Sequence, residues 1–102
     1  MIKIKLCYEN NFIKSFIVNG HANYESYGKD IVCASVSSIV ITSINMALNL
    51  NSSCLIAEDK PGLIKCELLV KDKIINTVFD NMINMLQDLE KQYSKNIKII
   101  KE

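Results

Sequence analysis

The sequence predicts an α+β fold, a ββαββαβ sandwich in which two helices pack on one antiparallel or mixed β-sheet. Two patterns lead to this class: short segments in which apolar and polar residues alternate, and two longer segments whose apolar residues follow a helical pattern. The chain has 102 residues, of which 49 % are hydrophobic and 23 % are charged. This composition is typical of one compact unit with a single core, so we expect one domain over residues 1–102.

The chain opens with a pattern typical of a β-hairpin. Residues 2–8 alternate isoleucine, leucine and tyrosine with lysine and cysteine, which predicts a half-buried strand. The segment Glu9-Asn10-Asn11 predicts a turn. We expect a second strand at 12–19, paired with the first.

Residues 31–49 form a long and largely apolar segment that predicts a helix. Because apolar residues occupy more than one side of this helix, we expect it to pack centrally. The segment also carries too many serine, threonine and asparagine residues for a membrane span. The first twenty residues lack the basic segment and apolar core of a signal peptide. We therefore expect a cytoplasmic protein with no membrane partner.

A second hairpin follows this helix. Strands are expected at 54–58 and 63–70, and they are joined around Pro61-Gly62, a dipeptide typical of turns. The cysteines of these strands, Cys54 and Cys66, alternate in phase with apolar neighbours, so we interpret them as small buried residues.

The C-terminal part of the chain predicts one more helix and one more strand. Over residues 72–93, apolar residues recur at steps of three and four, which is typical of an amphipathic helix. Ile97 and Ile99, with lysines beside them, predict a short last strand.

Charge and cysteine spacing exclude several classes of site. The formal net charge is +1 and the 12 basic residues are all lysines, so the bidentate arginine contacts of sequence-specific DNA readers are missing. We expect no direct nucleic-acid binding. The 4 cysteines form no CxxC pair and there is 1 histidine, so we expect no metal site, no cofactor and no disulfide.

The most informative stretch places the single histidine, His21, twelve residues before Cys33. Asp30 is a favourable N-cap residue, which makes Cys33 the third residue of the predicted helix. A helix N-terminus and a nearby imidazole both favour the reactive thiolate. Gly20 and Gly28 bracket the loop between the histidine and the helix. The pattern indicates a thiol nucleophile with a histidine base.

The run from Gly20 to Ser37, which contains Gly-His-Ala and Gly-Lys-Asp-Ile-Val-Cys-Ala, closely resembles the signature of the ribosomal-processing cysteine protease (Prp) family. The resemblance extends over essentially the full chain. Position by position, it implies that His21 and Cys33 are the catalytic residues and that Asp30 and Ser37 are polar residues beside them. Ser35 departs from the alanine expected in many members of the family.

The resemblance implies a single cysteine protease domain over 1–102 and a homodimer. The implied reaction removes a short N-terminal extension from large ribosomal subunit protein twenty-seven, so the implied partner is a ribosomal protein precursor. In this hypothesis His21 takes the proton of Cys33, the thiolate attacks the scissile carbonyl, and backbone N–H groups at the helix start stabilise the oxyanion.

Two alternatives remain open from the residues alone. In the first, the chain is a non-enzymatic ribosome-associated assembly or binding protein, Cys33 is a packed helix residue and His21 is a loop contact. In the second, Cys33 is a redox-sensing thiol with a reversible oxidised form.

Overall fold

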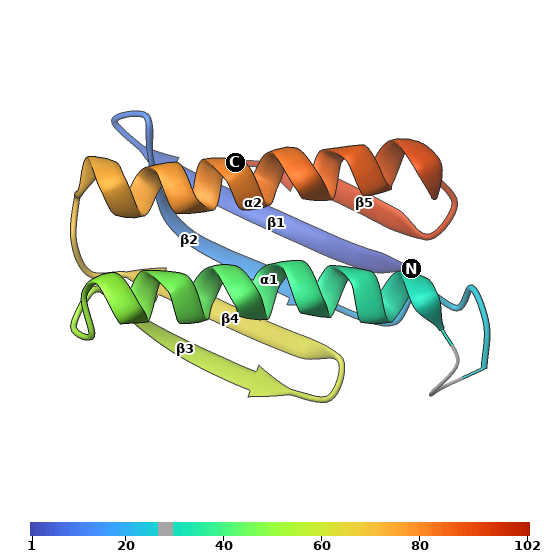
Figure 1. Ribbon diagram of the computed structural model, residues 1–102. Helices are drawn as coiled ribbons and strands as arrows, with labels where there is room; N and C mark the ends of the chain where they lie inside the picture. Colours follow the sequence, from blue (N-terminus) through green and yellow to red (C-terminus); the bar gives the residue numbers. More distant parts are fainter. Residues whose placement is uncertain (27–29) are drawn as a thin grey trace.

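The computed structural model describes residues 1–26 and 30–102 and confirms the predicted ββαββαβ order (Figure 1). The elements are β1 (Ile2–Glu9), β2 (Phe12–Asn19), α1 (Ile31–Leu50), β3 (Leu55–Lys60), β4 (Leu63–Leu68), α2 (Lys73–Gln92) and β5 (Ile97–Lys101). The expected boundaries differ most in the second hairpin, where β3 begins and ends later than 54–58 and β4 ends before residue 70. Asp72, which was expected inside the second helix, is instead its N-cap residue.

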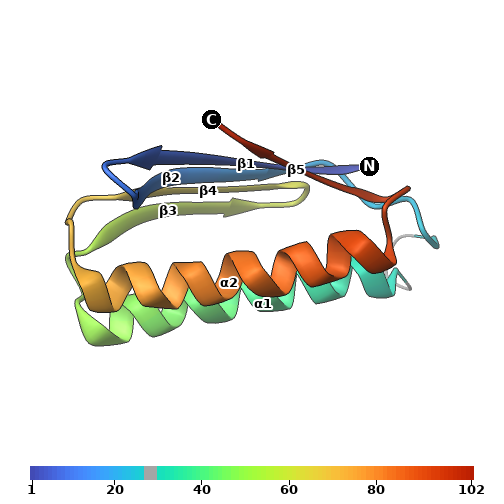
Figure 2. The same ribbon diagram turned by 90° about the horizontal axis from the view of Figure 1, so that it is seen from above.

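The five strands form one mixed sheet in the order β3-β4-β2-β1-β5. The two hairpins, β1–β2 and β3–β4, are antiparallel as predicted, and β2 also pairs with β4 in an antiparallel arrangement. The exception is β5, which returns beside β1 and pairs with it in parallel. Both helices lie on the same face of this sheet, so the molecule has two layers (Figure 2).

The core lies between the two helices and the sheet. Phe16 on β2 and Phe79 on α2 are almost fully buried, and their ring centroids lie 5.5 Å apart at an interplanar angle of 53°. Leu86 on α2 and Ile4 on β1 are also fully buried between the layers. Alternation on the strands and the helical pattern on α2 therefore converge on a single core, as the sequence predicts.

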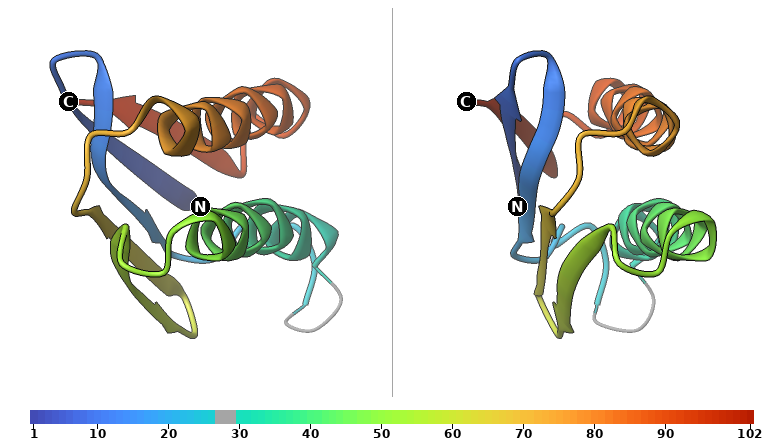
Figure 3. Two further views of the ribbon diagram at one scale, coloured as in Figure 1. Left: turned by 60° about the vertical axis from the view of Figure 1, so that its left-hand side comes forward. Right: turned by 90° about the vertical axis from the view of Figure 1, so that its left-hand side faces the viewer.

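The expectation that the first helix packs centrally is wrong. Helix α1 lies at the surface beside α2, and the two helices together cover one face of the sheet (Figure 3). Its buried residues are Val32, Val36, Val40, Ser43, Ile44 and Ala47. Ile31 and Met46, by contrast, are 55 % and 52 % exposed. The outer side of α1 mixes these apolar residues with polar ones such as Ser38, Thr42 and Asn45, and no third layer covers it among the described residues.

Helix α1 also has the length and composition of a membrane-crossing segment, with 20 residues and a mean hydropathy of 1.9. Length and composition do not distinguish such a segment from a helix that packs on a sheet. In this structure one side of α1 packs on the sheet and against α2.

The contact between Phe16 and Phe79 joins the two layers, so its loss is expected to be costly. The Phe79→Ala variant removes a fully buried ring and is expected to lower the free energy of unfolding by about 3–5 kcal/mol. Urea denaturation measures this change. The control is Ile74→Ala on the same helix, where the side chain is 66 % exposed and the expected change is below about 0.5 kcal/mol. Equal costs for the two variants would contradict this account of the core.

Candidate active site

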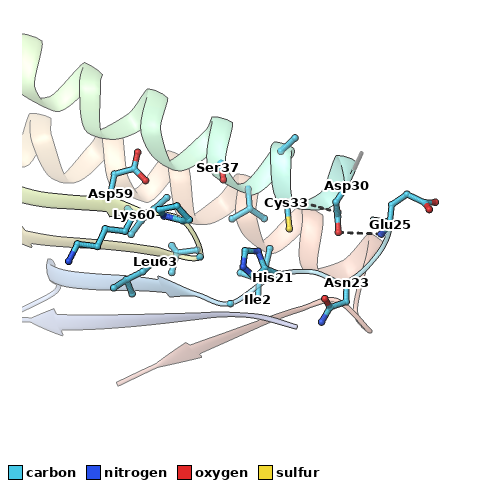
Figure 4. Close-up of a pocket in the computed structure, with 17 residues that line it drawn as sticks. Ile2, His21, Asn23, Glu25, Asp30, Cys33, Ser37, Asp59, Lys60 and Leu63 are labelled. Carbon is cyan, nitrogen blue, oxygen red and sulfur yellow. Dashed lines mark hydrogen bonds between the residues drawn. The ribbon is translucent and has the colours of Figure 1, made fainter. Parts of the chain in front are cut away.

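A cavity of about 690 Å³ opens where the first turns of α1 face the sheet (Figure 4). Its walls are the start of β1, the end of β2 with the loop that follows, the first two turns of α1, and the turn between β3 and β4. The predicted site residues that line it are Gly20, His21, Asp30, Cys33 and Ser37. The sixth predicted residue, Gly28, lies outside the described residues. The structure therefore brings five of the six together.

Cys33 is the third residue of α1, the position that the sequence predicts. The residue is half-buried and its thiol is free of disulfide bonds. The backbone N–H of Ala22 donates a hydrogen bond to the Cys33 sulfur at 3.1 Å. The sulfur therefore lies near the positive end of the helix dipole and also accepts a backbone N–H. In Figure 4 this sulfur points from α1 towards the side of the cavity on which His21 lies.

Asp30 fixes both the helix start and the loop before it. Its Oδ1 accepts the backbone N–H of Val32 and of Cys33, each at 3.0 Å, which caps α1. Its Oδ2 accepts the N–H of Tyr24 at 2.9 Å and that of Glu25 at 3.3 Å. Burial of the carboxyl raises its pKa, but these four N–H donors outweigh burial and hold the pKa below the ordinary value.

The cap has a consequence for the expected oxyanion donors. The N–H groups of Val32 and Cys33, which lie at the helix start, are both bound to Asp30. The N–H of Ala34 donates to the Asp30 carbonyl at 3.1 Å. In this arrangement these three N–H groups are therefore already engaged, and the backbone N–H directed at the sulfur comes from Ala22, in the loop.

His21 follows β2 and is held by the turn between β3 and β4. The N–H of Gly20 donates to the carbonyl of Gly62 at 2.9 Å. A Cβ added to Gly62 would lie 3.0 Å from Nε2 of His21, so the imidazole packs directly on this glycine. Gly20 itself has φ +99°, and a Cβ there would lie 2.5 Å from the carbonyl oxygen of Met1. The backbone contact therefore requires glycine at position 20, and φ +74° favours glycine at position 62. The sequence analysis predicted the turn but not its contact with the histidine.

Ser37 and the second hairpin complete the cavity. Ser37 lies four residues after Cys33 and therefore on the same side of α1. Asp59 and Lys60 bring two opposite charges to the cavity from the end of β3. The sequence analysis did not identify these two residues, because nothing local in the sequence shows that the hairpin reaches the helix start.

Asn96 is another residue near the site that the sequence analysis did not identify. Its side-chain Nδ2 donates a hydrogen bond to the carbonyl of Ala22 at 2.9 Å, although 74 residues separate the two in sequence. No spacing rule connects positions so far apart, and only the parallel return of β5 beside β1 brings them together.

Two of the other three cysteines differ from Cys33 in burial. Cys54 and Cys66 are buried, as the sequence predicts. Burial raises the pKa of the Cys66 thiol to about 12 and also raises the pKa of Cys54. Within residues 1–26 and 30–102, no three His, Cys, Asp or Glu side chains are grouped so that they could hold a metal ion.

The dual role of Asp30 predicts a pH-dependent stability. The Asp30→Asn variant keeps an N-cap oxygen but places an amide where Oδ2 accepts two N–H groups, so it is expected to cost about 1–2 kcal/mol of unfolding free energy at pH 7. Because the pKa of Asp30 is lowered in the folded state, its contribution is complete above the ordinary pKa of 3.8. It is lost as the pH falls through the folded-state pKa, so the difference between wild type and variant shrinks in acid.

Urea denaturation between pH 7 and pH 2.5 measures this difference. The matched control is Asp72→Asn, since Asp72 caps α2 through Oδ1 alone, with bonds to Ile74 and Ile75. Asparagine preserves such a cap, so the expected change is a few tenths of a kcal/mol. A cost for Asp30→Asn that stays constant down to pH 2.5 would contradict the role of the ionised carboxylate.

Comparisons with known proteins agree with this geometry. A family model described as cysteine protease Prp matches residues 1–98. The ribosomal processing cysteine protease Prp of Staphylococcus aureus (strain Mu50 / ATCC 700699) is 28 % identical over 90 residues, which cover 85 % of each chain. The protein of the same name from Bacillus subtilis (strain 168) is 29 % identical over 97 residues, which cover 85 % of this chain and 84 % of the relative.

Solved structures show the same relationship. The chain matches a crystal structure of an essential ribosomal processing protease Prp from S. aureus in complex with a covalently linked product peptide. The match has a TM-score of 0.94 and 25 % identity and covers 100 % of both chains. The chain belongs to the Prp family of ribosomal processing proteases, and it is a cysteine protease, a hydrolase that acts on peptide bonds.

Proposed function

We propose that this protease removes a short N-terminal extension from large ribosomal subunit protein twenty-seven, with Cys33 as the nucleophile and His21 as the general base and acid. The observation that carries the proposal is that both side chains line one cavity, with the cysteine in the first turn of α1. The family supports a ribosomal protein as the substrate, because its members from S. aureus and B. subtilis are named ribosomal processing proteases.

The proposed reaction has two halves. His21 takes the proton from the Cys33 thiol, and the thiolate attacks the scissile carbonyl carbon to form a tetrahedral intermediate. The intermediate collapses to a thioester when the C–N bond breaks, and His21 gives its proton to the leaving amine. Water, deprotonated by His21, then attacks the thioester, releases the acid product and restores the thiol.

The relative from S. aureus supports the covalent step. Its crystal structure holds a covalently linked product peptide, and covalent attachment of a peptide is what a thiol nucleophile produces. The cavity volume of about 690 Å³ lies within the range of pockets that bury a small ligand, so several residues of an extended peptide fit in it.

Peptide cleavage tests the proposal. Wild type, Cys33→Ala and His21→Ala are each incubated with a peptide that spans the extension junction of the organism's own ribosomal protein, and the products are identified by mass spectrometry. Wild type is expected to cut one bond. Each variant is expected to lose at least about 1,000-fold in rate, because nucleophile and base act as one unit.

The matched control is Cys7→Ala, which removes another half-buried free thiol, on β1, that does not line the cavity. This variant is expected to cut at the wild-type rate. Cleavage by Cys33→Ala would remove Cys33 from the nucleophile role. An intact peptide with wild type would overturn the proposed substrate, and full activity of His21→Ala would overturn the dyad.

Two further properties that the sequence analysis implies remain proposals, a homodimer and a cytoplasmic location. If the protein is a homodimer, analytical ultracentrifugation is expected to give about twice the chain mass of 11.5 kDa. Sedimentation as a monomer at every concentration, up to the highest that is soluble, would contradict it.

A further inference from the structure

We propose that Asn96 is a positioning residue for the reaction: it holds Ala22 so that the backbone N–H of Ala22 stays on the Cys33 sulfur. Asn96 lies in the turn between α2 and β5. It does not line the cavity, and its contact is with Ala22 and not with the sulfur. This inference rests on the proposed role of Cys33 as the nucleophile.

Ala22 is held on both sides of its Cα. On one side its N–H donates to the Cys33 sulfur at 3.1 Å, and on the other its carbonyl accepts from Asn96 Nδ2 at 2.9 Å. Ala22 is only 2 % exposed, so water does not replace either bond readily. An amide that fixes the carbonyl also restricts the backbone rotation that would turn the N–H away from the sulfur.

Asn96 is itself fixed by regular elements. Its backbone N–H donates to the carbonyl of Tyr93 at the end of α2, and its carbonyl accepts the N–H of Ile2 at the start of β1, both at 2.8 Å. The side-chain amide therefore projects from a rigid corner of the fold, where α2 ends and β1 begins.

The same turn makes a second contact with the loop. The rings of Tyr93 and Tyr24 meet edge to face, with centroids 5.4 Å apart and an interplanar angle of 81°. Between the two anchored positions lies Asn23, with φ 57°. The turn thus contacts the loop before and after a residue in the left-handed conformation, which asparagine adopts more readily than most residues.

The effect of the Ala22 N–H on reactivity depends on the charge of its acceptor, the Cys33 sulfur. A hydrogen bond to an ionised acceptor is stronger than one to a neutral acceptor, so an N–H held on sulfur stabilises the thiolate more than the thiol. We therefore expect loss of Asn96 to lower the fraction of Cys33 that reacts at neutral pH. A residue that only stabilised the fold would change the unfolding free energy and leave this fraction unchanged.

The test is the pH dependence of alkylation by iodoacetamide, read on the Cys33 peptide by mass spectrometry. Asn96→Ala and the near-isosteric Asn96→Leu both remove the amide without adding charge. In each variant the midpoint of the Cys33 alkylation profile is expected to rise by about one pH unit. Cleavage at neutral pH is expected to show a kcat lowered about tenfold with KM nearly unchanged.

Two controls accompany these variants. Asn84→Ala makes the same change at an exposed position of α2 and is expected to keep the wild-type midpoint. Cys7, alkylated in the same samples, reports any general change in thiol reactivity. A Cys33 midpoint in folded Asn96→Ala or Asn96→Leu that equals wild type overturns the inference.

A measurement on the wild-type protein needs no variant. The proposal requires one Asn96 side-chain amide proton to exchange with solvent more slowly than those of Asn84, as measured by NMR. Equal exchange at the two residues overturns it, even if both Asn96 variants fail to fold. The two proposals fail in distinguishable ways. Cleavage by Cys33→Ala would refute the role of Cys33 as the nucleophile, whatever the Asn96 variants do. An unchanged alkylation midpoint in the Asn96 variants would refute the role of Asn96 alone.

Discussion

The arrangement around Cys33 depends on one buried carboxylate, that of Asp30. A helix begins with backbone N–H groups that lack acceptors inside the helix, and the loop beside α1 also has N–H groups without backbone acceptors. Asp30 provides acceptors for both. One carboxylate oxygen accepts the N–H groups at the helix start, and the other accepts those of Tyr24 and Glu25. The carboxylate thus fixes where α1 begins and how the loop approaches it, and these two facts set the position of Cys33 relative to Ala22.

The other contacts that position the site residues come from backbone segments that lie close together. Gly20 and Gly62 bring the end of β2 and the β3–β4 turn within hydrogen-bond distance of each other, and the imidazole of His21 lies against the second glycine. Asn96 contacts the loop from the turn before β5 through its hydrogen bond to the Ala22 carbonyl. The site is therefore assembled from the first two turns of α1 and from loops and turns at one end of a two-layer scaffold.

Local patterns in the sequence predict most of the fold. Alternation in residues 2–8, the Pro61-Gly62 turn and the apolar spacing of 72–93 each report on neighbours a few positions away, and these elements are present. The position of Cys33 in the first turn of α1 also follows from a local rule, the preference for aspartate at the N-cap. The exposed side of α1 was not predicted, because the many apolar residues of 31–49 outweighed the polar residues, such as Ser38, Thr42 and Asn45, that occupy this side. Asn96 and Gly62 were missed as site residues because their roles depend on strand pairing and on contacts between distant segments, and no local period reports those.

The place of Asn96 in the chain affects the order in which the site is assembled. A ribosome makes residues 20–37 and 59–62 well before it makes the turn after α2. Until that turn and β5 have formed, β1 lacks its parallel neighbour and Ala22 lacks the amide that holds its carbonyl. A nascent chain therefore carries Cys33 and His21 without their last support, and the cavity reaches its final geometry only as the C-terminal strand docks. The cavity geometry therefore depends on a segment that is synthesised about 60 residues after Cys33.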